Sequence, residues 1–254
     1  MQLLDLKDKI VFITGSDKGL GKIFTEYFAI NNSEIISCSR KKNEDHDIFC
    51  EDLRKKYNIK LHNYYFDLEN NTEITQNLNS IVTNFSKIDI LINNAGSNFT
   101  SLIEMTSIEK LKKIYDINFF STYLITQKLL KLLKKSSAAS IINISSSASI
   151  ENNIGRFAYS SSKVLLNSFT KTLSKEVGRY KIRVNAIAPG LTDTQMMKST
   201  TTEKNIEQTI KRISLSRVGK PEEIANLVLF LSSNISNYIN GQVICIDGGL
   251  NEGL

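Results

Sequence analysis

The stretch IVFITGSDKGLG, residues 10–21, decides the fold. It joins a short β-branched run, Ile10–Thr14, to a segment of helical periodicity, Leu20–Asn31, through a turn with glycines at positions 15, 19 and 21. Such a turn allows a tight bend and lets a phosphate approach backbone N–H groups at a helix amino end. Its spacing, GxxxGxG, differs from the general GxGxxG dinucleotide fingerprint. The turn favours a phosphate-binding βα unit, with a plain connecting turn as the alternative.

Strands and helices alternate outward from this turn along the whole chain. The strands IVFIT, DILIN and SIINIS are apolar on both faces, as in a parallel sheet covered by helices on both sides. The expected strands are 10–14, 34–39, 61–66, 89–93, 141–145, 183–188 and 242–247. The expected helices are 20–31, 72–85, 107–135, 159–178 and 221–231, with a polar stretch up to residue 57. This pattern predicts an α/β fold: one Rossmann-type domain over residues 1–254, a doubly wound parallel sheet with helices on both faces.

One polar segment, residues 191–215, lacks clear periodicity. Because it follows the carboxyl end of an expected strand, we interpret it as a mobile substrate-covering loop.

The composition excludes several classes of protein. Hydrophobic residues make up 41% of the chain and charged residues 23%, which is typical of globular proteins rather than disordered chains. The amino-terminal residues lack the apolar run of a signal peptide, so we expect a cytoplasmic location. The cysteines, Cys38, Cys50 and Cys245, form no metal-binding pattern. The net charge of +6 comes from scattered lysines, which favours a solvated basic surface over a nucleic-acid groove.

Charge at the end of the second strand bears on cofactor choice. An NAD site places a carboxylate there for the ribose 2′-OH, whereas an NADP site places a cation for the 2′-phosphate. Here the strand ends Ser39–Arg40, and Lys18 lies within the glycine-rich turn. The sequence predicts NADP(H) in preference to NAD(H); two solvated surface cations are the alternative.

Four polar residues form a candidate catalytic set. Tyr159 and Lys163 are four residues apart on an expected helix, so their side chains share one face. Ser146 ends an apolar strand thirteen residues upstream of Tyr159, at the edge where parallel sheets bind ligands. Asn118 lies within the long preceding helix.

With these motifs the sequence resembles the short-chain dehydrogenase/reductase family over essentially its whole length. The motifs that carry the resemblance are TGSDKGLG (14–21), Asp67, NNAG (93–96), Asn118, Ser146, YSSSK (159–163), PGLTDT (189–194) and DGG (247–249). The resemblance implies an NADP-dependent oxidoreductase that interconverts a carbonyl and a secondary alcohol.

The resemblance also implies roles for individual residues. Tyr159 would exchange the proton, Lys163 would stabilise its phenolate and bind the nicotinamide ribose, Ser146 would bond the substrate oxygen, and Asn118 would hold a water in a proton relay. Ser145 and Ser147 flank Ser146, whose spacing to Tyr159 favours it. The implied cofactor-binding residues are Gly15, Lys18, Gly19, Leu20, Gly21, Ser39, Arg40, Asp67, Leu68, Asn94, Ala95, Gly96, Tyr159, Lys163, Pro189, Gly190, Thr192 and Thr194. No metal is required.

The family roles agree with elementary acid–base chemistry. A free tyrosine titrates near pH ~10, so a neighbouring ammonium is needed to bring proton exchange toward neutrality. A hydroxyl placed at the substrate oxygen stabilises the charge that develops there during hydride transfer.

The substrate is less well defined by the sequence. Two interpretations fit the apolar residues of the variable segments, which are a substrate pocket or the packing of a loop onto the core. These residues are Ile154, Phe157, Met196 and Met197. The chain is most similar to the subgroup containing 3-oxoacyl-carrier-protein reductases, whose acidic partner docks on basic residues. Lys134, Lys135, Arg179 and Lys181 lie in those regions, whereas Ser137 and Tyr180 depart from the subgroup's arginines.

Two alternatives to a 3-oxoacyl thioester reductase stay open. One is a reductase or dehydrogenase of a sugar, polyol or other small hydroxylated metabolite. The other is a catalytically silent NADP-binding regulatory protein, which has no need of the four catalytic residues. By analogy with the family we expect a homotetramer that assembles through the helices at 107–135 and 159–178 and the final strand.

Overall fold

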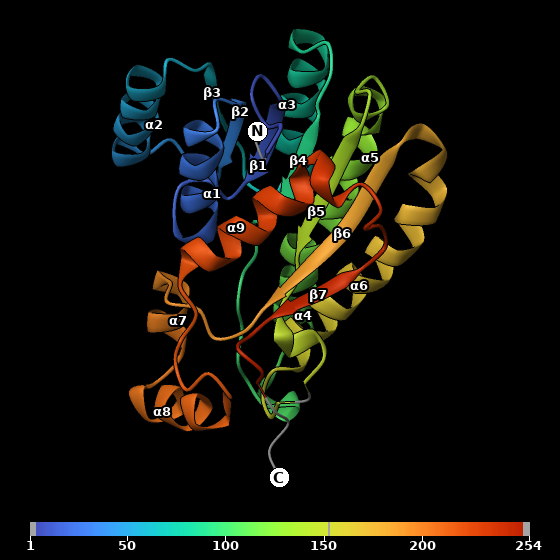
Figure 1. Ribbon diagram of the computed structural model, residues 1–254. Helices are drawn as coiled ribbons and strands as arrows, with labels where there is room; N and C mark the ends of the chain where they lie inside the picture. Colours follow the sequence, from blue (N-terminus) through green and yellow to red (C-terminus); the bar gives the residue numbers. More distant parts are fainter. Residues whose placement is uncertain (1–3, 152, 251–254) are drawn as a thin grey trace.

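Seven parallel strands form one sheet in the computed structural model, which describes residues 4–151 and 153–250 (Figure 1). The strand order is β3-β2-β1-β4-β5-β6-β7. The strands are β1 Ile10–Thr14, β2 Glu34–Ser39, β3 Leu61–Tyr65, β4 Ile90–Asn93, β5 Ala139–Ile144, β6 Ile182–Pro189 and β7 Val243–Ile246. The strand order reverses between β1 and β4, and ligands bind in such sheets beside the carboxyl ends of the strands at that point.

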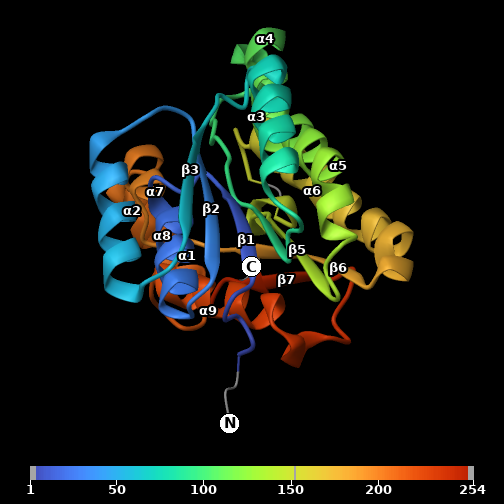
Figure 2. The same ribbon diagram turned by 90° about the horizontal axis from the view of Figure 1, so that it is seen from above.

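The helices cover both faces of the sheet (Figure 2). They are α1 Gly19–Ile30, α2 Glu44–Tyr57, α3 Asn71–Asn84, α4 Ile108–Tyr115, α5 Ser121–Leu133, α6 Phe157–Val177, α7 Gln195–Thr200, α8 Glu203–Arg212 and α9 Pro221–Ser232. The doubly wound α/β fold predicted from the sequence is confirmed. None of the described helices has the length and apolar character needed to cross a membrane.

Alternate strand residues supply two separate cores. Phe12 of β1 points into a core shared with α3, α5 and α6. Its neighbour Ile13 points into the opposite core, shared with α1, α2 and α9. Successive side chains of a strand lie on opposite faces, so strands that are apolar at every position are buried on both sides. This burial fixes the central strands and thereby the loops at their carboxyl ends.

The structure changes two expectations. Residues 191–215, expected as a loop, contain α7 and α8. The helix expected at 107–135 is divided into α4 and α5 by a π-helical turn, Asp116–Phe120. Such turns insert one extra residue into the helical repeat and are common at functional sites.

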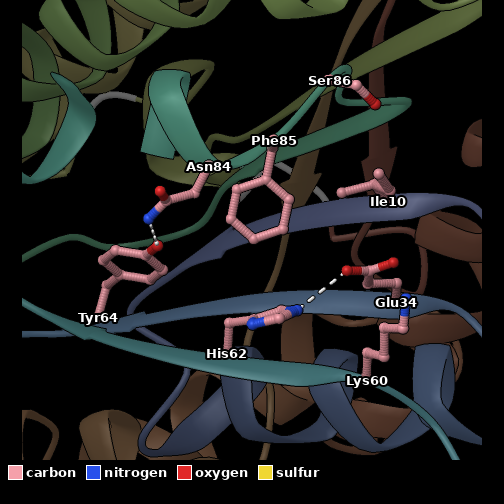
Figure 3. A pocket seen from close by; sticks show the side chains of 8 residues that line it. All are labelled: Ile10, Glu34, Lys60, His62, Tyr64, Asn84, Phe85 and Ser86. Carbon is pink, nitrogen blue, oxygen red and sulfur yellow. Dashed lines mark hydrogen bonds and ion pairs between the residues drawn. The ribbon is translucent and has the colours of Figure 1, made fainter. Parts of the chain in front are cut away.

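A cavity of about 570 Å³ lies at the amino ends of β1, β2 and β3 (Figure 3). His62 lines it and donates a 2.9 Å hydrogen bond from Nε2 to the Glu34 carboxylate, and the rings of His62 and Phe85 pack in a T-shaped contact. Because Ile10 and Glu34 are the first residues of their strands, this cavity lies at the edge of the sheet opposite to the predicted site.

Candidate active site

The glycine-rich turn takes a backbone path that its glycines permit. Gly15 and Gly19 have φ of +64° and +53°, which non-glycine residues adopt only with strain. A Cβ on Gly21 would lie 2.0 Å from the carbonyl oxygen of Gly15, so no other residue fits there. A Cβ on Gly19 would have no neighbour within 4 Å, which leaves its surroundings open to a ligand.

Thr14 and Asn94 tie this turn to the NNAG segment that follows β4. The hydroxyl of Thr14 accepts hydrogen bonds from the backbone N–H groups of Asn94 (3.0 Å) and Ala95 (2.9 Å). In return, the side-chain amide of Asn94 donates to the carbonyl oxygens of Thr14 (2.9 Å) and Gly15 (3.1 Å). These hydrogen bonds hold together two motifs about eighty residues apart in sequence, at the carboxyl ends of β1 and β4.

A buried chain of polar groups supports the turn from below. The Ser16 and Ser37 hydroxyls are 2.7 Å apart, and the Ser37 hydroxyl is 2.9 Å from Nε2 of His46 in α2. Burial lowers the pKa of His46, so the imidazole is neutral near pH 7. Sequence reasoning missed this support, since an isolated histidine in a polar stretch carries no motif.

At the end of β2, Ser39 is buried, while Arg40 and Lys18 are exposed. Asp67, just after β3, accepts a 3.0 Å hydrogen bond from the backbone N–H of Glu69. Leu68 packs against the core below it. The predicted adenosine-binding residues therefore lie at the ends of adjacent strands, β2 and β3.

Ser146 and Tyr159 meet at the end of β5. Ser146 caps a 3₁₀ turn, Ser147–Ser149, by accepting a hydrogen bond from the backbone N–H of Ala148 (3.2 Å). Tyr159 lies in the first turn of α6. Burial raises the pKa of Tyr159, and a hydrogen bond with the Ser146 hydroxyl and the charge of Arg156 oppose that rise. A protonated phenol beside a serine hydroxyl is the arrangement that general acid catalysis on a carbonyl oxygen requires.

Lys163 is buried one helical turn beyond Tyr159. Its ammonium donates a 2.8 Å hydrogen bond to the carbonyl oxygen of Ile144 and lies 5.9 Å from the centroid of the Tyr159 ring. Burial lowers the pKa of Lys163 to about 8. The ammonium is therefore charged at neutral pH but close to losing its proton.

Asn118 lies in the π-helical turn and is almost fully buried. Its side-chain oxygen accepts a hydrogen bond from the backbone N–H of Ser97 (2.7 Å), and its amide donates to the Ser97 carbonyl (2.9 Å) and the Ser162 hydroxyl (3.0 Å). A Cβ on Gly96 would lie 3.4 Å from both Asn118 Oδ1 and Lys163 Nζ. The structure thus brings Asn118, Lys163 and the NNAG segment together.

The segment after β6 encloses the same edge of the sheet. The Thr192 hydroxyl donates to the carbonyl oxygen of Gly190 (3.1 Å), and Thr194 caps α7 through the backbone N–H of Met197 (3.2 Å). A Cβ on Gly190 would lie only 2.6 Å from Cβ of Asp247. The 189–194 motif therefore packs closely against the closing DGG motif. The sequence motifs from all parts of the chain therefore converge on the carboxyl ends of the strands.

Arg156 is a site residue that the sequence analysis did not identify. Its guanidinium carbon lies 4.9 Å from the centroid of the Tyr159 ring, and its Nη1 donates a 3.2 Å hydrogen bond to the Thr100 hydroxyl. The only signal in the sequence was a cation three residues before the candidate tyrosine, in a segment without a recognised motif.

Comparison with known proteins agrees with this geometry. A family model described as enoyl-(acyl carrier protein) reductase matches residues 15–251. The chain is 35% identical to the 3-oxoacyl-[acyl-carrier-protein] reductase FabG of Aquifex aeolicus, over 97% of this chain and 99% of that protein. It is 34% identical to a 3α-hydroxysteroid dehydrogenase of Mediterraneibacter gnavus, over 96% and 97% of the two chains.

The chain belongs to the short-chain dehydrogenase/reductase family. Among solved structures, it is similar to L-sorbose reductase of Gluconobacter frateurii in complex with NADPH and L-sorbose, with a TM-score of 0.89, 25% identity and 98% of each chain covered. As a short-chain dehydrogenase/reductase, the protein is an oxidoreductase of carbonyl and alcohol groups. Its named relatives act on carrier-linked, steroid or sugar compounds, so membership of the family leaves the substrate open.

Proposed function

We propose that the protein is an NADP(H)-dependent reductase, with Tyr159 as the proton donor and Ser146 as the hydrogen-bond donor to the substrate oxygen. The observation that carries the proposal is the meeting of Ser146, Tyr159 and Lys163 at the carboxyl end of β5, beside the glycine-rich turn. In this position the three side chains face the place where a dinucleotide and a carbonyl compound would come together.

The residues present fit a dinucleotide. Gly19 leaves the phosphate side of the turn open, and the amino end of α1, at Lys18, has no side-chain cap that would occupy its N–H groups. Arg40 and Lys18 are exposed cations suited to a 2′-phosphate, which favours NADP(H) over NAD(H). The positions proposed for the adenine are Asp67 and Leu68, and those for the nicotinamide end are Pro189, Gly190, Thr192 and Thr194.

NADPH, when bound, supplies the hydride that reduces the carbonyl carbon. The chain's own groups handle the oxygen. Ser146 donates a hydrogen bond to it as negative charge builds up, and Tyr159 gives it a proton. The Lys163 ammonium stabilises the phenolate that Tyr159 becomes. The side chain of Asn118 is held by hydrogen bonds with Ser97 and Ser162, and it fixes the NNAG segment opposite Lys163. Asn118 would also hold a water through which a proton returns to Tyr159.

A second observation favours an acyl thioester delivered by a carrier protein. Lys134, at the end of α5, and Arg179, beyond α6, both lie over the ring of Tyr180, at 4.1 and 4.8 Å from its centroid. Tyr180 stands where the subgroup has an arginine, and its ring contacts two cations that together form one basic patch. Such a patch suits an acidic protein, and carrier-protein reductases occur among the relatives.

The proposal includes three further properties: a cover over the substrate, a homotetramer and a cytoplasmic location. Residues 191–215, with α7 and α8, cover the substrate, since the Asn98 amide donates a hydrogen bond to Thr200 of α7 (3.1 Å). A homotetramer would bury Phe120, Tyr123 and Val164, which are half exposed around α5 and α6. The free thiols of all three cysteines suit a cytoplasmic location. A monomeric mass by light scattering would contradict the tetramer.

The decisive assay is NADPH oxidation by the purified protein with an acetoacetyl thioester, free and carrier-linked, and with diketones and keto-sugars. We expect NADPH to be preferred over NADH and Tyr159→Phe to abolish turnover while it still binds NADPH. Activity confined to the carrier-linked thioester would establish the carrier-dependent function. NADPH binding without turnover of any carbonyl compound would overturn the proposed catalysis.

A further inference from the structure

Arg156 lies beside Tyr159, the proposed proton donor, and has no acidic partner among the residues that the structure describes. Its guanidinium carbon is 4.9 Å from the centroid of the Tyr159 ring, so the cation lies within reach of any substrate that contacts the phenol. Within residues 4–151 and 153–250, Arg156 forms no ion pair with a carboxylate. Burial lowers the pKa of Arg156, and among the described residues it is the Tyr159 phenol, not a carboxylate, that opposes this effect. A half-buried cation of this kind is costly unless a ligand neutralises it.

The neighbourhood of Arg156 is fixed rather than loose. Nη1 donates to the Thr100 hydroxyl (3.2 Å), and one residue earlier the Gly155 carbonyl accepts from the backbone N–H of Ser101 (2.8 Å). These two contacts fasten the start of α6 to the loop after β4. The guanidinium is therefore held with a defined orientation beside the phenol, and such preorganisation is what a specific anion site requires.

We propose that Arg156, with Thr100 beside it, binds a carboxylate of the substrate, and that the enzyme reduces aliphatic oxo acids. This inference rests on the proposed reductase chemistry of Tyr159 and Ser146, and it names free oxo acids as the substrate in place of the carrier-linked thioester. Arginine presents a planar fork of N–H donors that matches a carboxylate in two parallel hydrogen bonds. Because the guanidinium lies over the Tyr159 ring, the carboxylate and the reacting carbonyl must be close in the substrate, as in a 2-, 3- or 4-oxo acid.

Apolar side chains beside Arg156 indicate the rest of the substrate. Ile154 is 89% exposed and Phe157 is 53% exposed, and both are within two residues of Arg156. Exposed apolar side chains on either side of a lone cation suit a hydrocarbon chain that extends away from the carboxylate. In a carrier-linked substrate a thioester stands where the free acid has its carboxylate. Arg156 would therefore bind free oxo acids and not the carrier-delivered substrate.

The test compares oxo acids with their own methyl esters. For 2-, 3- and 4-oxo acids of four to eight carbons, kcat/KM with NADPH is measured for each acid and ester, in the wild type, Arg156→Gln and Arg156→Lys. We expect the wild type to prefer at least one acid over its ester. Arg156→Gln should lower kcat/KM for that acid by about 10- to 100-fold, the loss expected for hydrogen bonds to a charged group. The ester should lose much less, and Arg156→Lys should fall between.

Lys56→Gln is the matched control. Lys56 lies over the ring of Tyr57 in the same kind of contact, with its ammonium 5.1 Å from the ring centroid, but at the end of α2. Its substitution should leave the acid-to-ester ratio unchanged. A ratio that is the same in the wild type and Arg156→Gln would overturn the inference, as would a wild type that prefers every ester.

A binding experiment separates this inference from the proposed catalysis. Butyrate and hexanoate, which contain no carbonyl to reduce, are titrated calorimetrically into the protein with NADP⁺ present, and into Arg156→Gln. Binding that is lost in the variant supports the carboxylate site even if no tested carbonyl is turned over. Absence of binding to the wild type overturns the site, while reduction of neutral carbonyls would leave the proposed function intact.

Discussion

The ammonium of Lys163 donates its 2.8 Å hydrogen bond to the carbonyl oxygen of Ile144, the last residue of β5. This contact ties α6 to the strand that ends just before Ser146, and so holds Tyr159 and Ser146 in register. The same lysine is buried, which lowers its pKa to about 8. Lys163 therefore combines a structural contact with a charge that is lost just above neutral pH.

That pKa predicts the pH dependence of carbonyl reduction. In the proposed mechanism Lys163 stabilises the phenolate that forms when Tyr159 gives up its proton. Above pH 8 Lys163 becomes neutral, so kcat/KM for reduction should fall as pH rises through about 8. Lys163→Met should lower kcat/KM by at least ~100-fold at pH 7 and remove this descending limb. Initial rates between pH 6 and 10 measure both effects. A descending limb that persists in the variant would assign it to another group.

Arg156 predicts a second pH effect, in the direction of alcohol oxidation. If Tyr159 is the base as proposed, oxidation requires its phenolate, and the Arg156 cation lowers the pKa of Tyr159 against the effect of burial. Arg156→Gln should therefore raise the pH at which oxidation of a neutral alcohol reaches half its maximum, and Arg156→Lys should raise it less. The pH–rate profiles of the three proteins check this, with Lys56→Gln as control. Superimposable profiles would show that the guanidinium does not act on the phenol.

The sequence predicted most of this site because its motifs are local and their order is fixed. Ser146, Tyr159 and Lys163 could be placed from one strand end and one helical spacing, and the structure brings them together. The helices α7 and α8 were not predicted. None of their residues is buried, α7 has only six residues, and α8 carries two isoleucines, Ile206 and Ile210, in an otherwise polar segment. Two apolar residues one turn apart form too short a period to predict a helix.

Two features of the candidate site, Arg156 and the π-helical turn, were not predicted from the sequence. Arg156 was passed over because its meaning depends on a ring three residues later and on Thr100, more than fifty residues away. The π-helical turn around Asn118 was likewise invisible, since a helical period of apolar residues continues through it. Both features concern the geometry of the site rather than the identity of the fold.

His46 predicts a loss of stability on acidification. In the unfolded chain this histidine takes up a proton near pH 6.5, whereas burial delays the uptake to lower pH in the folded chain. Lowering the pH below 6.5 therefore favours unfolding, by at most about 1.4 kcal/mol per pH unit from this group. His46→Gln keeps a hydrogen-bond donor for Ser37 but does not titrate. In this variant the free energy of unfolding should fall less steeply as the pH is lowered. Urea unfolding between pH 5 and 7 measures it; equal slopes in both proteins would contradict the prediction.

Two glycines of the same turn should respond differently to alanine. At Gly21 the new Cβ would lie 2.0 Å from the Gly15 carbonyl oxygen, and backbone cannot move aside cheaply, so Gly21→Ala should destabilise the fold and abolish NADPH binding. At Gly19 the Cβ meets nothing within 4 Å, and only the positive φ of +53° costs stability, by about 1–2 kcal/mol. Gly19→Ala should therefore remain folded, with its methyl group on the side left open for the diphosphate. Thermal unfolding and NADPH fluorescence titration separate the two effects. If Gly19→Ala bound NADPH as tightly as the wild type, the open side of the turn would not be where the cofactor lies.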